Sequence, residues 1–324
     1  MSTIKVTPIA FESLGVRSMC TSIQTSDVKL LIDPGLALGP RFSLLPHPLE
    51  YQTRERLRKS IVEKAHQTDL IVITHYHYDH YTPNFVDTTW IGATPEIAQE
   101  IYQDKDILVK DFRNMVNPSQ RRRGWLASRL LSKCAKSVKI ADEQRFIFGE
   151  TEMVFSAPVP HGEEGGELGW VLMVKVSYGS ETALFASDVQ GPASSTTSYT
   201  IVEEKPDLLI VGGPPLYLKG LRVGEATINR ALKNLVNLSQ SLQTIIVDHH
   251  LLRAAEWETF LQPAYDTAHK VNHQIFTAQK FSNSSNDVFE YRRKELYELY
   301  PPSQEFLRWT RLSKEKKRVT PPPL

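Results

Sequence analysis

The chain has 324 residues, of which 41% are hydrophobic and 23% charged, and its formal net charge is +1. This is the composition of a soluble globular protein with one large or two ordinary domains, and the near-neutral charge gives no whole-protein argument for a nucleic-acid or membrane partner. Because only Cys20 and Cys134 are present, we expect no disulfide framework, no thiolate metal site and a reducing compartment. The N-terminal residues show no signal-peptide pattern, and no apolar run approaches the roughly 18 residues of a membrane span, so we expect a cytoplasmic protein.

Apolar runs in the first hundred residues predict strands that alternate with helices. The strand at 28–32 runs into an Asp-Pro-Gly turn signal at 33–35. The helical spacing of apolar residues predicts a helix over 49–66, which leads into a buried strand at 70–73. A second helix is expected over 96–102, after a capping threonine and a first-turn proline.

One strongly biased segment lies between Phe112 and Ala141, where no acidic residue occurs. Its central part has the apolar spacing of a short basic helix. The segment either forms an electropositive rim that attracts an anionic substrate, or is a solvated helix face balanced by acids elsewhere in space. The sequence leaves both readings open. The cationic residues are Arg113, Arg121, Arg122, Arg123, Arg129, Lys133, Lys136 and Lys139.

The rest of the chain consists of predicted strands followed by predicted helices, the latter over 225–238 and 254–261. Because helices follow strands in each half, we predict an α/β (α+β) fold whose sheets carry helices on their outer faces. We predict a single domain over residues 1–300 and a polar, Pro- and Lys-rich tail over 301–324 that is disordered or loosely docked. The strands are expected over 145–148, 153–155, 170–176, 182–186, 208–211 and 244–247.

The stretch 74–80, just after a predicted buried strand, is rich in metal donors. Alternate side chains of an extended chain point to the same side, so His75, His77 and Asp79 can converge. His80 breaks this alternation, and the chain must turn there to bring in a fourth donor. Neutral imidazole and carboxylate are the ligands that Zn, Fe and Mn prefer. We therefore predict a metal site here rather than an ordinary polar loop.

Further donors follow later strands of the chain. His161, Asp188 and the pair His249-His250 each come after a predicted apolar strand. Strand ends gather at one edge of a sheet, where ligand and catalytic groups are held on a rigid scaffold. Each residue alone is weak evidence, because a lone histidine is more often structural and a strand-end aspartate more often forms a turn. Together they add one carboxylate and three histidines, with His249 and His250 competing for one role.

This ordered set of donors resembles the metal signature of a known superfamily. The set His75-x-His77-x-Asp79-His80, His161, Asp188 and His249 resembles the five-part metal signature of the metallo-β-lactamase superfamily. The stretch Leu31–Gly35 is similar to the early strand and turn of that superfamily, so the resemblance spans about residues 4–250. A closer likeness links the chain to an uncharacterised, largely archaeal group of predicted metal-dependent hydrolases of that fold. The stretches that carry the closer likeness are Glu12–Ser18, His75–His80, Gly212–Pro215 and Asp248–His250.

The resemblance implies a four-layer αβ/βα sandwich with a two-metal site at one edge of the sheets. Two divalent ions are expected, with Zn the first choice and Fe or Mn the alternatives. The resemblance also implies that the metal pair activates a bridging hydroxide, that Asp79 hydrogen-bonds this nucleophile, and that the second metal binds a substrate oxygen. By position, one ion would be held by His75, His77 and His161, the other by Asp79, His80 and His249, and both by Asp188.

Some branches of the superfamily do not fit this chain. The diiron redox branch usually has Glu where His77 stands, which favours hydrolysis here. The stretch between Asp188 and His249 is too short for the inserted domain of the RNA-cutting branch.

Strand alternation places His249 and His250 on opposite sides. The resemblance favours His249 as the last ligand, and His250 then supports a ligand or contacts the substrate.

We therefore predict a metal-dependent hydrolase that acts on an anionic small-molecule ester, phosphodiester or lactone. Asp79 and His250 are the candidate catalytic residues. A nuclease acting on RNA or DNA is the alternative enzyme, and a metal-binding scaffold on the same fold is the non-enzymatic alternative. The residues do not determine the oligomeric state or the native metal. The candidate substrate contacts are Tyr78, Arg121, Arg122 and Arg123.

Overall fold

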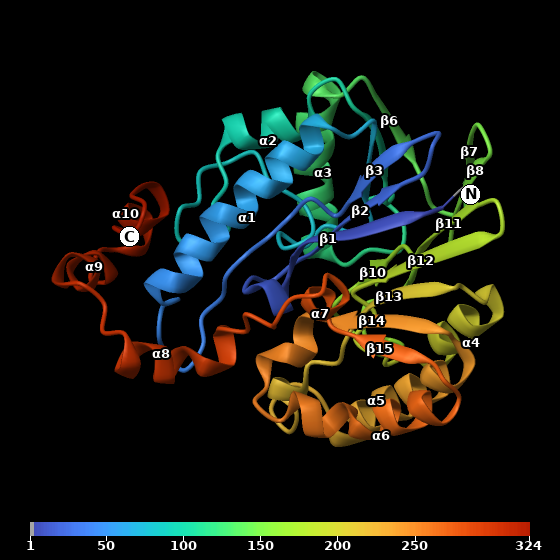
Figure 1. The fold of residues 1–324 in the computed structure, drawn as a ribbon. Coiled ribbons are helices and arrows are strands. Elements are labelled where there is room, and N and C mark those ends of the chain that lie inside the picture. Colours follow the sequence, from blue (N-terminus) through green and yellow to red (C-terminus); the bar gives the residue numbers. More distant parts are fainter. Residues whose placement is uncertain (1–2) are drawn as a thin grey trace.

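The computed structural model describes residues 3–324, which form two large β-sheets with helices on their outer faces (Figure 1). The strands of the first sheet are β1 Lys5–Phe11, β2 Met19–Gln24, β3 Lys29–Ile32, β4 Leu70–Ile73, β5 Asp106–Val109 and β6 Ser137–Ile140. These six strands lie in chain order across the sheet. The first three are antiparallel neighbours, and β3 to β6 run parallel.

The second sheet has seven strands in the order β15-β14-β13-β12-β11-β8-β7. These are β7 Arg145–Phe148, β8 Thr151–Phe155, β11 Val174–Tyr178, β12 Glu181–Ser187, β13 Leu208–Gly212, β14 Thr244–Asp248 and β15 Gln274–Phe276. β12 to β15 run parallel, and the remaining pairs are antiparallel. A separate two-stranded ribbon pairs β9 Val159–Pro160 with β10 Trp170–Val171.

Helices cover the outer face of each sheet (Figure 1). Those over the first sheet are α1 Pro48–His66, α2 Pro95–Tyr102 and α3 Pro118–Cys134, and those over the second are α4 Ser195–Glu204, α5 Glu225–Ser241 and α6 Trp257–Lys270. Further helices are α7 Ala278–Phe281, α8 Arg293–Leu299, α9 Gln304–Thr310 and α10 Lys314–Val319. Short 3₁₀ helices are η1 Glu12–Leu14, η2 Leu216–Leu218, η3 His249–Arg253 and η4 Glu290–Arg292.

The central strands are buried on both faces. Within β4, Leu70 and Val72 belong to the apolar cluster between the two sheets, whereas Ile71 and Ile73 pack in the cluster that contains helices α1 to α3. Burial on both faces explains the continuous apolar sequence of this strand. The predicted four-layer αβ/βα sandwich is confirmed by this arrangement.

The strand predicted over 170–176 is interrupted in the structure, because it is divided between β10 and β11. The backbone N–H of Leu172 donates to the carbonyl of Thr74, 3.1 Å away, and that of Met173 donates to Oγ of Ser156 at 3.0 Å. The apolar run is continuous in sequence, but Leu172 bonds to the loop after β4 of the first sheet, while Met173 bonds to Ser156, just after β8 of its own sheet. The hydrogen bond between Leu172 and Thr74 connects the start of the donor stretch 74–80 to the second sheet.

The C-terminal segment is not the disordered or loosely docked tail that we expected. Phe306 is fully buried and Trp309 is 4% exposed. Their rings lie 6.0 and 5.6 Å from the ring of Tyr51 on α1. The two residues are three positions apart and share one face of α9, so they dock together. The prediction of disorder used the average composition of residues 301–324, which is polar, and did not weigh these two aromatic residues. The predicted domain limit at residue 300 stays a prediction.

Among residues 3–324, no helix is both long enough and apolar enough to span a membrane.

Candidate metal centre

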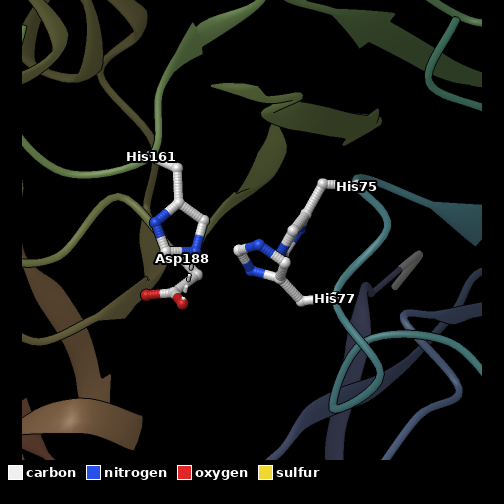
Figure 2. A group of neighbouring side chains, drawn as sticks. All are labelled: His75, His77, His161 and Asp188. Atoms are coloured by element: carbon white, nitrogen blue, oxygen red, sulfur yellow. Dashed lines mark ion pairs between the residues drawn. The ribbon is translucent and has the colours of Figure 1, made fainter. Parts of the chain in front are cut away.

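The predicted donors lie where strands from both sheets end. β4 of the first sheet leads into the loop that carries His75 and His77, β12 of the second sheet ends just before Asp188, and β9 just before His161. Figure 2 shows the two loop histidines pointing toward His161 and Asp188, which come from the opposite side. Side chains far apart in the sequence therefore meet at one edge of the sandwich.

The first donor set consists of His75, His77, His161 and Asp188, whose ligand atoms all lie within 4.8 Å of one another (Figure 2). Nε2 of His161 is 2.9 Å from Oδ2 of Asp188. The ring centroids of His77 and His161 are 4.6 Å apart. The structure thus brings together the residues that the resemblance implies for one ion.

The second donor set consists of Asp79, His80 and His249, again with ligand atoms within 4.8 Å of one another. Nε2 of His249 lies 3.6 Å from Oδ2 of Asp79 and 3.5 Å from Oδ2 of Asp188. Nε2 of His80 lies 4.0 Å from the same oxygen of Asp188. Asp188 is therefore placed between the two sets and within reach of both.

Two other combinations of donors meet the same distance limit. One joins Asp33 to His75 and His80, and the other joins Asp188 to the adjacent histidines of η3. In the first, Oδ2 of Asp33 is 2.8 Å from Nδ1 of His80. In the second, Nε2 of His250 is 3.0 Å from Oδ2 of Asp188. Asp33 thus bonds to a member of the second set, and His250 approaches Asp188 about as closely as His161 does, so distance alone leaves both His249 and His250 as candidate ligands.

Several buried donor atoms at this edge have no hydrogen-bond partner among the described residues. They are Nε2 of His75, His80, His161 and His249, together with Oδ1 of Asp188. Leaving a buried polar atom unpaired costs roughly 1–3 kcal/mol. Imidazole nitrogen and carboxylate oxygen are the donors of Zn, Fe and Mn sites. The residues present therefore fit divalent metal ions, which would satisfy all of these atoms together.

Asp33, which follows β3, supports the donor loop from the neighbouring strand. Its Oδ1 accepts from the backbone N–H of Thr74 at 2.8 Å, and its Oδ2 accepts from the Thr74 hydroxyl at 2.6 Å. Because Oδ2 also binds Nδ1 of His80, the other nitrogen of that ring is turned toward the second donor set. Sequence reasoning had identified Asp33 only as part of a turn. The signal for its supporting role was its position at the end of a strand parallel to β4.

We expect the Asp33→Asn substitution to weaken Zn binding by roughly 10- to 100-fold with the fold retained. The amide offers one acceptor oxygen instead of two, so either Thr74 or His80 loses its partner. Competition with a chromophoric chelator measures the affinity. Asp27→Asn is the matched control, because Asp27 accepts from the backbone N–H groups of Glu150 and Thr151 away from the donor sets. An equal loss in both variants would contradict the assigned role.

Burial is the main reason why three histidine rings of the donor sets, those of His75, His77 and His249, are neutral. Burial holds the pKa values of His75 and His77 well below the ordinary 6.5, and neighbouring histidines add to the effect. Burial also lowers the pKa of His249 to about 3. His80 differs, because its hydrogen bond to Asp33 and the charge of that carboxylate outweigh burial and raise its pKa. Neutral rings present the lone pairs that a metal ion requires.

The two carboxylates of the donor sets are ionised at neutral pH. Burial alone would raise their pKa values, but the surrounding histidines outweigh it. His80 and His249 hold the pKa of Asp79 well below its ordinary value, and His250 and His161 do the same for Asp188. Both residues can therefore act as anionic ligands or hydrogen-bond acceptors.

The four predicted substrate contacts differ in whether they lie near the donor loop. Tyr78 packs in an aromatic cluster, with its ring centroid 5.6 Å from that of Tyr81. Arg123 on α3 lies 4.9 Å from the Tyr78 ring and donates from Nη1 to the backbone carbonyl of Tyr76 at 3.0 Å. Arg121 and Arg122 are exposed, and Arg121 donates to a backbone carbonyl of its own segment. The structure therefore brings only Arg123, of the three arginines, into contact with the donor loop.

Two buried charged residues beside His250 were not predicted as site residues. Nε of Arg253 donates to Oε2 of Glu12 at 2.7 Å, and Nη1 of Arg253 lies 2.9 Å from Nδ1 of His250. Arg253 lies one helical turn after the histidine pair, which was the only local signal for it. Its partner Glu12 lies in η1, just after β1 of the first sheet. A short sequence motif does not show that two residues so far apart in the chain form an ion pair.

Comparisons with known proteins identify relatives over nearly the whole chain, although no family model matches it. The chain is 37% identical over 306 residues to a UPF0282 protein of Korarchaeum cryptofilum, covering 94% of this chain and 98% of that protein. It is 41% identical over 269 residues to a UPF0282 protein of Methanopyrus kandleri, covering 83% and 92%. Among solved structures, the metallo-β-lactamase fold protein YhfI from Bacillus subtilis is similar with a TM-score of 0.46 and 13% identity, covering 85% of this chain and 96% of that chain.

Proposed function

We propose that this chain, which belongs to the UPF0282 protein family, is a metal-dependent hydrolase with a dinuclear centre. The observation that carries the proposal is the convergence of two donor sets on Asp188. Both sets contain buried donor atoms that have no hydrogen-bond partner within residues 3–324. Such atoms destabilise the fold unless a cation binds them, so their convergence favours a metal centre over a purely structural cluster.

The donor sets define which residues would hold the two ions. One ion would be held by His75, His77 and His161, the second by Asp79, His80 and His249, and both by Asp188. Such a pair of ions supplies an acidified water molecule and a Lewis acid for a substrate oxygen. The mixture of imidazole and carboxylate makes Zn the first choice, with Fe or Mn as alternatives.

Asp79 and His250 are the side chains of this centre that we assign to catalysis. The Asp79 side chain is 20% exposed, compared with 2% for Asp188, so Asp79 is the carboxylate that faces incoming molecules. Because its low pKa keeps it ionised, it can accept a hydrogen bond from the attacking water and orient it. The His250 side chain is 13% exposed, and its Nε2 atom lies 3.0 Å from Oδ2 of Asp188. Its contribution is to hold that carboxylate in place.

We further propose that the substrate is an anionic small-molecule ester, phosphodiester or lactone. Arg123 supports this choice because its guanidinium group lies against the loop that carries His77. Its positive charge is one of the influences that lower the pKa of His77, so its electrostatic field reaches the first donor set. A fixed cation beside the metal centre raises the local concentration of anionic substrates.

We expect Arg123→Ala to raise KM for an anionic substrate by roughly tenfold, with kcat changed by less than about twofold. The double variant R121A/R122A should change neither value, because both side chains are exposed and neither contacts the donor loop. Steady-state kinetics with an anionic ester and its neutral analogue separate charge from packing. An equal loss on both substrates would show that Arg123 acts only by holding the backbone of Tyr76.

A nuclease is the second candidate, and one feature of α3 favours it. The exposed face of this helix carries Arg122, Arg129 and Lys133, and the guanidinium group of Arg129 lies 5.1 Å from the ring of Trp125, which is 47% exposed. Cations around an exposed aromatic ring suit single-stranded nucleic acid. This function predicts that affinity for RNA or DNA falls steeply with salt, with a slope that reflects several phosphate contacts. Affinity that is flat between low and moderate salt would exclude it.

The test of the hydrolase proposal is a comparison of stripped and reconstituted protein. We expect the chelator-treated protein to be inactive, and the protein reloaded with Zn, Mn or Fe to hydrolyse at least one of three substrate types: aryl phosphodiesters, aryl esters and lactones. The measurement is product release together with metal content for each preparation. A preparation that carries both metal equivalents and hydrolyses none of them would instead favour the metal-binding scaffold.

A further inference from the structure

One buried arginine touches both candidates for the last metal ligand. Arg253 is 1% exposed, and its Nη1 atom lies 2.9 Å from Nδ1 of His250, while its Nη2 atom lies 3.3 Å from Nδ1 of His249. Nη1 also donates to the hydroxyl of Tyr217 at 3.2 Å, and Nε donates to Oε2 of Glu12 at 2.7 Å. The guanidinium group of Arg253 therefore contacts the Nδ1 atom of each of the two adjacent histidine rings.

The chemistry of arginine decides which nitrogen of His250 carries the hydrogen. Arginine has donors only and keeps its proton in proteins, so Nδ1 of His250 must accept the 2.9 Å hydrogen bond. The other neighbour of this nitrogen, the Tyr217 hydroxyl at 3.4 Å, can also donate. A neutral ring whose Nδ1 accepts carries its hydrogen on Nε2. That atom lies 3.0 Å from Oδ2 of Asp188, which is an ionised acceptor.

We propose that Arg253 is a positioning residue that fixes His250 as the Nε2–H tautomer, so that His250 donates to Asp188 and leaves the last metal-ligand position to His249. The ligand assignment rests on the proposed metal centre, whereas the tautomer rests on hydrogen bonds within the chain alone. The proposal resolves the alternative that strand alternation left open between the two histidines.

The environment of His249 differs from that of His250 in two respects. Nε2 of His249 is buried without a hydrogen-bond partner among residues 3–324, so it is available to a metal ion. Nη2 of Arg253 also reaches Nδ1 of His249, but at 3.3 Å, compared with 2.9 Å between Nη1 and Nδ1 of His250, so the contact with His249 is the weaker of the two. Oε2 of Glu12 lies 3.9 Å from the same Nδ1, which is too long for a hydrogen bond, and accepts from an Nδ1–H group only if the two side chains move closer together. A ring that binds metal through Nε2 needs such an acceptor.

Arg253 is itself held by contacts from both halves of the sandwich. Glu12, which is 3% exposed, lies in η1 after β1 of the first sheet, whereas Arg253 ends η3 after β14 of the second sheet. Asp248 fixes the start of η3, because its Oδ1 accepts from the backbone N–H groups of Ser13 and His249 at 3.1 and 2.7 Å. The position of the arginine relative to both rings therefore depends on the packing of the two sheets.

The first test reads the tautomer directly in the full-length protein. Long-range proton–nitrogen NMR of ¹⁵N-histidine-labelled protein distinguishes the two neutral tautomers, and the variant H250Q assigns the signals of His250. We expect the Nε2–H pattern for His250 in chelator-treated protein and again after Zn loading, which should move the signals of His249 instead. An Nδ1–H pattern for His250 before loading, or a Zn-bound Nε2 afterwards, would overturn the proposal.

The second test removes the arginine together with its carboxylate partner, so that no buried charge is left unpaired. In E12M/R253M we expect His250 to lose its single tautomer, and one of the two Zn equivalents to bind roughly tenfold more weakly. The matched control is R17M/E290M, which removes a neighbouring pair joined at 2.7 Å that does not contact the histidines. Identical tautomers and Zn affinities in the two double variants would overturn the proposal. If E12M/R253M does not fold, the measurement on the native chain still decides.

The two tests also separate this proposal from the proposed function. The tautomer of His250 in chelator-treated protein does not depend on any hydrolytic activity. A native chain that fails to bind two equivalents of metal would overturn the dinuclear centre and leave the tautomer result standing. A chain that binds two equivalents but shows the other tautomer would overturn only the role of Arg253.

Discussion

Replacing Asp188 with alanine is expected to lower the metal content of the purified protein from about two equivalents to one or fewer. Oδ2 of Asp188 lies 2.9 Å from Nε2 of His161 and 3.5 Å from Nε2 of His249, so one side chain serves both donor sets. Losing it removes an anionic donor from each set at once, and it removes the charge that offsets two bound cations. Elemental mass spectrometry of protein purified in the same buffer measures the result.

The matched control for this prediction is Asp207→Ala. Asp207 is an exposed aspartate in the bend just before β13, and it accepts from the backbone N–H of Thr182 at 2.7 Å. It lies next to β13 at the end remote from Gly212, so its loss should leave about two equivalents in place. Circular dichroism of both variants shows whether the fold is retained. A folded Asp188→Ala variant with unchanged metal content would show that the donors do not act as a centre.

Replacing Arg293 with methionine is expected to lower the free energy of unfolding by about 3–5 kcal/mol. Arg293 is fully buried, and its Nε and Nη2 atoms donate to the two carboxylate oxygens of Glu50 at 2.8 and 2.7 Å. Its Nη1 atom also donates to the carbonyl of Gly39 at 2.9 Å. The substitution leaves the carboxylate of Glu50, which is 1% exposed, buried without its cation. Urea unfolding at constant metal content measures the loss.

Two comparisons test whether the lost charge pair is the cause. The double variant R293M/E50Q should recover at least half of the loss, because no buried charge then remains unpaired. Arg292→Met removes the neighbouring pair with Glu295, whose side chains are 41% and 46% exposed, and should cost less than about 1 kcal/mol. Equal losses for Arg293→Met and Arg292→Met would show that burial of the ion pair does not matter.

Much of the architecture follows from local patterns in the sequence. The run 70–73 is apolar throughout and 244–247 is apolar after Thr244, which indicates strands buried on both faces, and both are strands in the structure. The basic segment was predicted as a short helix, and α3 spans Pro118–Cys134. The patterns fail where a neighbour from the other sheet intervenes, as in the run 170–176, which is divided because Leu172 bonds to Thr74.

The C-terminal segment shows a second kind of failure. Its many charged residues and prolines predict poor order. This prediction averages over the whole segment and gives no extra weight to the two aromatic residues that hold it in place. Phe306 and Trp309 dock against α1, which lies about 250 positions earlier in the chain. A composition-based prediction has no access to such a partner. The stability of this region depends on a few buried contacts rather than on its average polarity.

The order of donors along the chain, from His75 to His249, was visible in the sequence because metal donors follow strand ends and strand ends share an edge. The strand-end positions therefore identify the candidate residues for a centre, and the resemblance that these residues carry implies the fold that would present them. Which polar neighbours support these residues becomes clear from the tertiary structure. Asp33 reaches His80 across 47 positions and Arg253 reaches Glu12 across 241. Hydrogen bonds over such separations depend on how the two sheets pack, and no local pattern of residues encodes that packing.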